Sequence, residues 1–251
     1  MLSTVKLSPG ISCPTTDGGA AAVLVSEKWL DAHPELKPQA ILIAGQAMAT
    51  DSPALYSRSA MDLVGYEMTA KAGREAMAEA KISPKDVRVC EVHDCFSANE
   101  MVTIDGLGLC EKGKAHEMVR AGEITYGGEV VVNPSGGLIS KGHPLGATGI
   151  AQCAELTWQL RGWANNRLVP DAPVALQHNL GLGGAAVVTV YLRADGKTNS
   201  EILDVPKVSN SGYNPAVEAR PVTQEQIKKV VSRSHTSAWL GVEGRKVQAM
   251  L

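Results

Sequence analysis

The segment that most constrains the fold is a glycine-rich stretch, residues 133–149, which carries His143 and leads into an apolar pattern. Downstream of it, apolar residues recur at mostly helical spacing and predict a helix: Ile150, Cys153, Ala154, Leu156 and Leu160. Gly146 and Gly149 allow close approach to the helix start, where unpaired N–H groups and the positive end of the helix dipole gather. A histidine placed there can meet an anionic intermediate with its ring and with the local amides. A surface histidine in a glycine-rich turn is the plainer alternative.

A second candidate site lies in residues 92–100, where His93 and Cys95 are two positions apart. The run 86–92 reads as a short buried strand, and a helix is predicted from about Ser97. Reactive side chains often follow strands in this way in α/β sheets. The histidine can donate to an oxyanion or move a proton, and the cysteine can act as acid, base or nucleophile. The alternative is a small buried cysteine beside a loop histidine.

The third segment, residues 174–191, reads as a strand, a glycine-rich turn and a second strand. The β-branched run 187–190 supports the second strand. Gly181 and Gly183 lead into a strand instead of a helix, so a dinucleotide-binding loop is excluded. Residues 137–142 also lack the order of a phosphate-binding loop, and the sequence therefore identifies no cofactor-binding residues.

Together and in this order, the three segments resemble the C-terminal half of a thiolase, over about residues 13–191. The His-Asp-Cys-Phe sequence of residues 93–96, in place of the usual Asn-Glu-Ala-Phe, is similar to the sterol-carrier-protein-type branch of that family. Residues 142–144 match the family's Gly-His-Pro loop. Most thiolases have a Cys-x-Gly loop where this chain has His178, Asn179 and Leu180. Residues 126–128 and 153–156 agree with the same branch.

The resemblance implies a site and a reaction. His93 and His143 would stabilise an enolate oxygen, Cys95 would carry the proton, and neighbouring imidazoles would promote ionisation of its thiol. The backbone N–H of Leu180 would lie at an oxyanion position. The implied reaction is thiolytic cleavage of a 3-oxoacyl-CoA, or the reverse Claisen condensation, in fatty-acid or sterol side-chain metabolism. Further residues are assigned to the oxyanion site or the substrate pocket: Asp94, Tyr126, His178 and Asn179.

The front of the chain departs from the family pattern. Residues 13–26 resemble the last strand segment of the thiolase N-terminal half, and we expect nearly all the rest of that half, with its nucleophilic cysteine, to be missing. Cys13 itself matches a structural segment. The expected fold is therefore an α/β, thiolase-like C-terminal half of βαβ type, with a mixed sheet packed by helices and remnant strands of the N-terminal half.

Three parts are expected along the chain: a remnant of the N-terminal half with a connecting helix (1–84), the domain with the catalytic loops (85–195), and a polar linker with a C-terminal extension (196–251). Strands are predicted at 20–25 and 40–44, and helices at 61–80 and 115–120. Residues 225–231 form a possible further helix.

Composition is consistent with a globular protein of 251 residues, 44% hydrophobic and 20% charged. The net charge of −2 argues against a nucleic-acid partner. Five cysteines without a Cys-x-x-Cys pair suggest a reducing compartment. The set Cys90, His93, Cys95 and Cys110 suits no common zinc module, so no metal is expected. No apolar run approaches the length of a membrane span, and the start lacks a signal-peptide pattern.

The resemblance implies a peroxisomal location, with the cytoplasm as the alternative. Residues 249–251 resemble the Ser-Lys-Leu address only at the first and last places. No permanently bound cofactor is expected, and coenzyme A enters as a substrate. A half-thiolase would expose apolar surface, so we expect a homo-oligomer or a partner chain that supplies the N-terminal half.

Three hypotheses remain open at this point. The chain is a thiolase-type acyltransferase half that is incomplete alone, a non-catalytic thiolase-like binding or assembly protein, or a retro-aldolase of acyl-CoA side chains. The last needs no acyl-cysteine and predicts that Tyr126 points toward His93 and His143.

Overall fold

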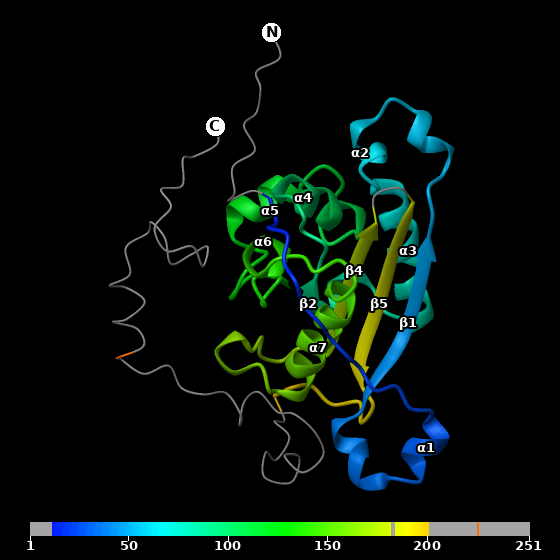
Figure 1. Cartoon of the computed structure of the whole chain (residues 1–251), viewed down its shortest axis with the longest axis vertical. Coiled ribbons are helices and arrows are strands. Elements are labelled where there is room, and N and C mark those ends of the chain that lie inside the picture. Colours follow the sequence, from blue (N-terminus) through cyan, green and yellow to red (C-terminus); the bar gives the residue numbers. More distant parts are fainter. Residues whose placement is uncertain (1–11, 182–183, 201–224, 226–251) are drawn as a thin grey trace. The chain divides into compact units, whose positions relative to one another are not determined.

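A computed structural model of the chain describes residues 12–181, 184–200 and 225. Its centre is a five-stranded mixed sheet with the strand order β1-β5-β4-β2-β3 (Figure 1). The central strand β4 pairs parallel with β2 and antiparallel with β5. At the edges, β1 pairs antiparallel with β5, and β3 pairs parallel with β2. The predicted α/β fold with a mixed sheet is confirmed.

The strands span β1 (Ile41–Ala49), β2 (Val87–Glu91), β3 (Val131–Val132), β4 (Val174–Gly181) and β5 (Ala185–Arg193). The α-helices span α1 (Glu27–Asp31), α2 (Ala60–Leu63), α3 (Tyr66–Ala80), α4 (Ser97–Gly106), α5 (Ala115–Ala121), α6 (Gly137–Lys141) and α7 (Thr148–Arg161). Short 3₁₀ turns are η2 (Pro34–Gln39), η3 (Pro53–Tyr56), η4 (Pro84–Asp86) and η5 (Asn165–Arg167).

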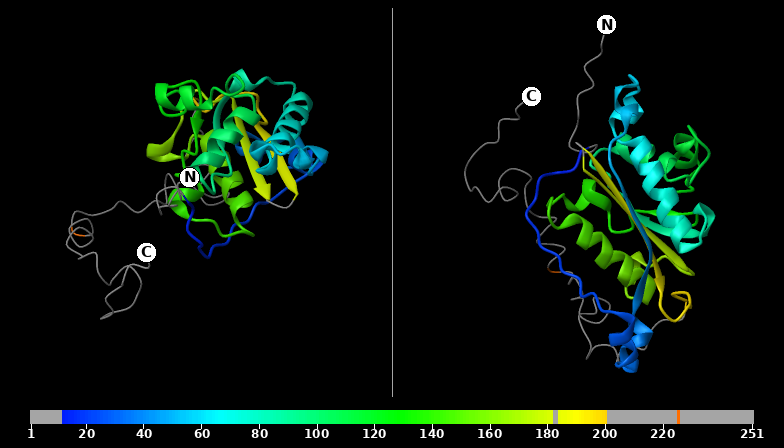
Figure 2. Two further views of the ribbon diagram at one scale, coloured as in Figure 1. Left: turned by 90° about the horizontal axis from the view of Figure 1, so that it is seen from above. Right: turned by 90° about the vertical axis from the view of Figure 1, so that its right-hand side faces the viewer.

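Helices cover both faces of the sheet (Figure 2). On one face, α3 and α4 pack with the side chains of Val174, Leu176 and Leu180 from β4. On the other, Leu156 and Leu160 of α7 pack against Ala175. Because side chains of a strand alternate between its faces, β4 presents His178 to the α3 side and Gln177 and Asn179 to the α7 side. This alternation decides which candidate residues can meet.

Most sequence-based elements are confirmed: the strand before His93, the helix from Ser97, the short helix near 115–121, the helix after the glycine-rich segment and the closing hairpin. The single helix predicted over 61–80 is instead two helices, α2 and α3. Gly65 separates them with a φ of 92°, and a Cβ there would lie 2.8 Å from Cδ1 of Leu180. The two-residue strand β3 was not predicted, because two residues carry no periodic signal.

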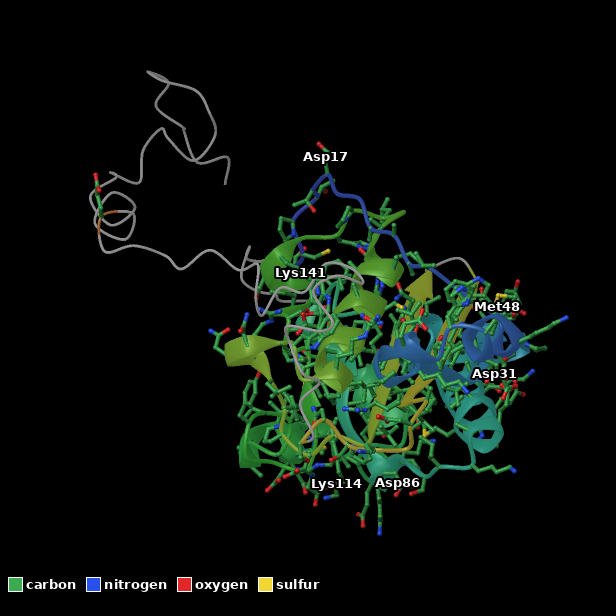
Figure 3. All side chains as sticks on the ribbon, turned by 90° about the horizontal axis from the view of Figure 1, so that it is seen from below. Asp17, Asp31, Met48, Asp86, Lys114 and Lys141 are labelled. Carbon is green, nitrogen blue, oxygen red and sulfur yellow. The ribbon has the colours of Figure 1, made fainter. Side chains whose placement is uncertain are left out.

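The strand predicted at residues 20–25 is wrong. This segment has no regular secondary structure, and Val23 and Leu24 are 91% and 75% exposed. A strand needs a neighbour for its backbone hydrogen bonds, and no described strand pairs with this segment. Figure 3 shows Asp17, just before it, on the outer bend of the N-terminal segment.

Residues from both sides of the expected boundary at 84/85 form one sheet, since β1 and β5 are direct neighbours. The chain divides into compact units at 1–216 and 217–251. The possible helix at 225–231, apart from Glu225, and residues 249–251 lie outside the described residues.

Candidate functional site: a histidine pair between two loops

His93 and His143 come together although fifty positions separate them in the chain. Their rings meet edge to face with centroids 4.8 Å apart. His93 follows the carboxyl end of β2, and His143 lies between α6 and α7. The sheet and the start of α7 therefore bring the two histidine-bearing loops to one place.

Both histidines are held neutral at neutral pH. Burial, followed by the neighbouring His143, lowers the pKa of His93 to about 4, although a side-chain hydrogen bond with Asn179 acts in the opposite direction. Burial also lowers the pKa of His143. Nδ1 of His93 is buried and has no hydrogen-bond partner in the described part of the chain. An unpaired buried polar atom calls for an explanation, and a ligand that supplies the partner is one.

Thr148, the first residue of α7, fixes the ring of His143. Its Oγ1 lies 2.7 Å from Nδ1 of His143 and 3.2 Å from the carbonyl oxygen of Pro144. The hydroxyl has one proton to give. If it donates to Nδ1, the proton of a neutral His143 is on Nε2, which becomes a hydrogen-bond donor; if it donates to the Pro144 carbonyl, Nδ1–H of His143 donates to Oγ1 and Nε2 is an acceptor.

Asp94 holds the two loops together. Its carboxylate accepts hydrogen bonds from the backbone N–H of Leu138, at 2.6 Å, and of Ile139, at 3.5 Å. A Cβ at Gly137 would lie 2.1 Å from Oδ2 of Asp94, so only glycine permits this approach. Asp94 is 3% exposed, and its oxygens thus serve the start of α6. Sequence reasoning had assigned it to the substrate pocket.

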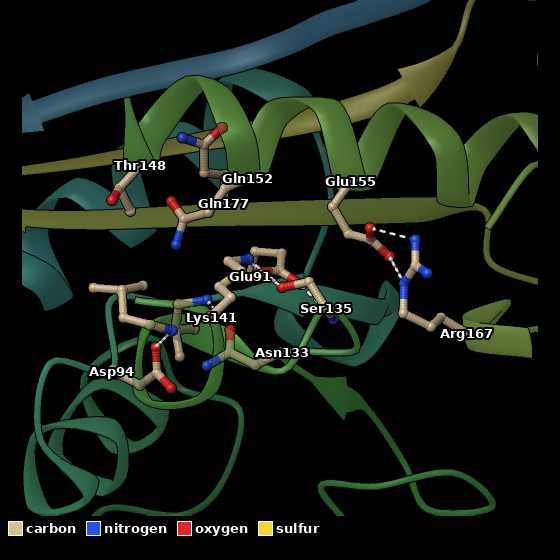
Figure 4. A network of polar contacts seen from close by, with 12 residues as sticks. Glu91, Asp94, Asn133, Ser135, Lys141, Thr148, Gln152, Glu155, Arg167 and Gln177 are labelled. Carbon is tan, nitrogen blue, oxygen red and sulfur yellow. Dashed lines mark hydrogen bonds and ion pairs between the residues drawn. The ribbon is translucent and has the colours of Figure 1, made fainter. Parts of the chain in front are cut away.

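An ion pair between the buried Glu91 and the partly exposed Lys141 also anchors this loop (Figure 4). Glu91, at the end of β2, accepts hydrogen bonds from the backbone N–H and the hydroxyl of Ser135, and pairs with Lys141 at 3.2 Å. Burial raises the pKa of Glu91, while Lys141 and Ser135 oppose that shift. Because these contacts tie β2 to both ends of residues 135–141, the glycine-rich loop is anchored on the sheet.

The N-terminal segment crosses both loops. The backbone N–H of Cys13 donates to the carbonyl of Cys95 at 2.9 Å, and that of His143 donates to the carbonyl of Pro14 at 3.2 Å. Gly142 has a φ of 92°, and a Cβ on it would overlap Thr16. Residues 12–16 therefore clamp the two histidine-bearing loops, a role that the sequence did not reveal.

Cys95 is a protonated thiol in this environment. Burial, and then the nearby Cys13, raise the pKa of Cys95, while its own amide and that of Phe96 act to lower it. Neither histidine is among the groups that shift the pKa of Cys95, so the expectation that imidazoles promote its ionisation stays a prediction. A protonated thiol can donate a proton, and it must lose that proton before it can act as a base.

The three candidates on β4 have different positions. His178 is fully buried, and its Nε2 lies 3.0 Å from Oγ1 of Thr69 on α3. Burial and then His93 lower its pKa to about 3. Asn179, on the opposite face, hydrogen-bonds to Gln152 of α7 as well as to His93. Leu180 is 6% exposed, with its side chain toward Gly65.

Tyr126 is not brought to the histidine pair. Its hydroxyl donates to the carbonyl of Arg167 at 2.7 Å. Arg167 in turn pairs with Glu155 in the middle of α7 (Figure 4). The orientation that would favour retro-aldol chemistry through Tyr126 is therefore not observed.

An open cleft of about 340 Å³ lies at the start of α7, and its lining includes Pro144 but none of His93, Cys95 and His143. One wall is formed by the N-terminal segment from Thr16 to Ala20, and the other by Pro144 to Ala147 at the start of α7. Within the described residues, no three His, Cys, Asp or Glu side chains gather as a metal-binding group. No helix in that part of the chain has the length and apolar character needed to cross a membrane.

Sequence reasoning missed the residues that hold the site. Thr148 had a signal, since a hydroxyl residue at a helix start commonly binds nearby groups. Pro14 and Thr16 had none, because their contacts with the loops come from tertiary structure.

Comparisons with known proteins identify the family of this chain. Residues 49–194 match the family described as "Thiolase C-terminal domain-like". The chain is 58% identical over 180 residues to "Sterol carrier protein 2" of Gallus gallus, which covers 71% of this chain and 33% of that protein. It is 41% identical over 181 residues to "Acetyl-CoA acetyltransferase" of Methanothermobacter thermautotrophicus, covering 72% of this chain and 46% of that protein.

Among solved structures, the "Ltp2-ChsH2(DUF35) aldolase" superposes with a TM-score of 0.54 at 21% identity, covering 61% of this chain and 40% of that one. This likeness concerns the fold. The chain spans about one third of the length of the chicken relative and less than half of the archaeal one. By its family match, its relatives and its fold, the chain belongs to the thiolase superfamily, in the sterol-carrier-protein-type branch.

Proposed function

We propose that this chain provides the enolate-handling half of a thiolase-type acyl-CoA acyltransferase site. The observation that carries the proposal is the pair of neutral histidines, His93 and His143, whose rings meet between two anchored loops, one of which also carries Cys95. A carbanion next to a thioester is stabilised as an enolate, whose oxygen needs preorganised hydrogen-bond partners. Nε2 of His143 is the donor in this proposal, and His93 is the proposed second histidine at the enolate.

Cys95 is the proposed proton carrier at C2 of the acyl group. In thiolytic cleavage of a 3-oxoacyl-CoA, the bond between C2 and C3 breaks and its electron pair stays on C2 as an enolate. The protonated thiol of Cys95 then gives its proton to C2. In the reverse, Claisen direction, the thiolate removes that proton. The raised pKa of Cys95 suits the first direction.

The full reaction also needs a nucleophilic thiol to accept the acyl group. We assign this role to a cysteine supplied by a partner chain or a further segment, as the family resemblance implies. Coenzyme A is the proposed second substrate, and the cleft between residues 16–20 and 144–147 is the proposed approach for the acyl-CoA. The backbone N–H of Leu180 is kept as a candidate oxyanion donor. We further propose that the chain acts in fatty-acid or sterol side-chain metabolism in the peroxisome. Co-localisation of the tagged chain with a peroxisomal matrix marker would test the location.

The deciding experiment measures hydrogen–deuterium exchange at C2 of acetyl-CoA in heavy water by NMR, next to thiolysis of a medium-chain 3-oxoacyl-CoA. Exchange at C2 requires the enolate partners and the proton carrier and no nucleophile. We expect exchange without thiolysis by the chain alone, and loss of exchange in Cys95→Ala. Cys110→Ser is the matched control, since Cys110 is also half-buried. A folded chain that exchanges nothing would refute the proposal.

A second candidate is a non-catalytic binding or assembly protein with a thiolase-like fold. The exposed apolar side chains of Val23 and Leu24 favour an interaction role. Tight binding of acyl-CoA or of a partner, with no exchange at C2, would identify this alternative. The retro-aldolase hypothesis has lost its specific support, because Tyr126 is bonded to Arg167.

A further inference from the structure

Two cysteines from distant parts of the chain lie directly opposite each other. Ser12 and Phe96 form an antiparallel bridge, and the backbone N–H of Cys13 donates to the carbonyl of Cys95 at 2.9 Å. Ser12 and Phe96 form an isolated bridge outside the named strands, and one step along the chain from each leads to Cys13 and Cys95. The two cysteines are therefore cross-strand neighbours.

Opposed residues of an antiparallel pair project their side chains to the same face, with Cα atoms about 5.5 Å apart when the pair is hydrogen-bonded. Disulfides join cysteines whose Cα atoms are roughly 4.4–6.8 Å apart. The bridge and the backbone hydrogen bond therefore bring the two cysteines to a spacing that is compatible with a disulfide.

The exposure of the two thiols and the effect of Cys13 on the pKa of Cys95 agree with a short distance between them. Both are free and partly exposed. The charge of Cys13 is, after burial, the largest influence that raises the pKa of Cys95. Cys13 is itself near Asp94, which raises its pKa. Within the described residues, no cysteine is among the groups that shift the pKa of Cys110: burial, Asp105 and Glu111 raise it, and the backbone of Lys114 lowers it.

We propose that Cys13 and Cys95 are a modification site, at which a hydroperoxide oxidises the two thiols to a reversible intramolecular disulfide. Because the pKa of each thiol is raised, the attacking thiolate forms by loss of its proton at alkaline pH. It attacks the peroxide, so that an S–O bond forms, the O–O bond breaks and hydroxide leaves. The second thiolate attacks that sulfur, forming the S–S bond while the S–O bond breaks and a second hydroxide leaves. With the two thiol protons, two thiols and one hydrogen peroxide give one disulfide and two waters. Exchange with an added dithiol reverses the reaction.

The disulfide would act on the site in two ways. It removes the thiol of Cys95, and it links the N-terminal segment covalently to the loop of His93. Since Pro14 already binds the backbone of His143, oxidation would fasten the clamp across both loops. The cross-link stands on geometry alone. Its effect on proton exchange rests on the proposed function.

The test treats the purified, reduced chain with a small molar excess of hydrogen peroxide and then blocks the remaining thiols. Peptides are mapped by mass spectrometry without reduction. We expect a loss of two hydrogen atoms in the intact mass and a cross-linked peptide containing Cys13 and Cys95. This peptide should be absent from Cys13→Ser and Cys13→Ala, retained in Cys110→Ser, and removed by dithiothreitol.

The proposal is overturned if Cys95 is converted to sulfinic or sulfonic acid without a cross-link, or if the disulfide joins other cysteines or two chains. Far-UV circular dichroism of each variant shows whether it is folded. Proton exchange at C2 is followed in the same samples. Exchange lost on oxidation and restored by dithiothreitol supports the regulatory effect, whereas a mapped disulfide with no exchange in the reduced chain would count against the proposed function only.

Discussion

The imidazole rings of His93 and His143 meet edge to face with centroids 4.8 Å apart. Each ring is partly removed from water, and a charge on one disfavours a charge on the other. Both rings are therefore neutral at neutral pH, and the positions of two protons decide which nitrogen donates. Predictions about the site follow from this relationship.

Replacing His143 with Ala should remove the enolate donor. We expect C2 exchange of acetyl-CoA to fall about 100-fold or more, the effect typical of losing one oxyanion donor. The thermal midpoint should change little, because His143 is only partly buried. His116→Ala is the control, since His116 is an exposed histidine that approaches Glu117. Equal exchange rates in the two variants would remove His143 from the mechanism.

Thr148→Val should disturb the tautomer of His143 while keeping the shape of the residue. Without the hydroxyl, Nδ1 loses the group 2.7 Å away that can donate to it, and the proton of the ring is free to move to Nδ1. We expect about a tenfold loss of exchange, corresponding to roughly 1.4 kcal/mol. Thr148→Ser should restore the rate. Nitrogen-15 NMR of the imidazole reports the tautomer directly, and an unchanged Nε2–H signal in the valine variant would contradict the assignment.

Glu100 should make stability depend on pH in a defined direction. Burial, and then Asp94, raise its pKa to about 7 from an ordinary value of 4.5. A carboxyl whose folded pKa is raised stabilises the fold below its unfolded pKa, and this contribution is lost as the pH rises through about 7. Glu100→Gln should therefore increase the free energy of unfolding at pH 8, by on the order of 2 kcal/mol, relative to its effect at pH 4.

Urea unfolding at both pH values measures this difference. Glu117→Gln is the control, because Glu117 is exposed and its pKa is lowered by Lys114. If Glu100→Gln has the same effect on unfolding at pH 4 and pH 8, the raised pKa is wrong.

The apolar run in residues 20–25 should promote association. Val23 and Leu24 are largely exposed, and the edge strand β1 also exposes Leu42 and Met48. We expect light scattering at micromolar concentration to show an oligomer, and Leu24→Lys to shift it toward the monomer. Glu27→Lys, a surface charge change on α1, is the control. A monodisperse monomer of the unaltered chain would contradict self-association. A different partner chain would then be expected to cover the exposed apolar side chains of residues 20–25 and β1.

Local patterns predicted most elements because each of them depends on neighbouring residues. The β-branched run of β5 and the Ala-rich face of α3 bury one side in any compact fold, and their periods are readable. The failures have a common cause. Residues 20–25 have the composition of a strand, but pairing depends on a neighbour that the described structure does not provide. The break at Gly65 depends on its contact with Leu180, more than a hundred residues away.

The sequence by itself determined the superfamily, the α/β class and the two loops that carry His93, Cys95 and His143. These follow from short motifs and from periodicity, which are local. Only the tertiary structure decided that His93 and His143 touch, that His178 turns to Thr69 on the other face, and that Tyr126 binds Arg167. It also placed Cys13 opposite Cys95. The physical reason is that sheet register and helix packing set distances between remote residues, whereas a motif sets only the chemistry that each residue brings.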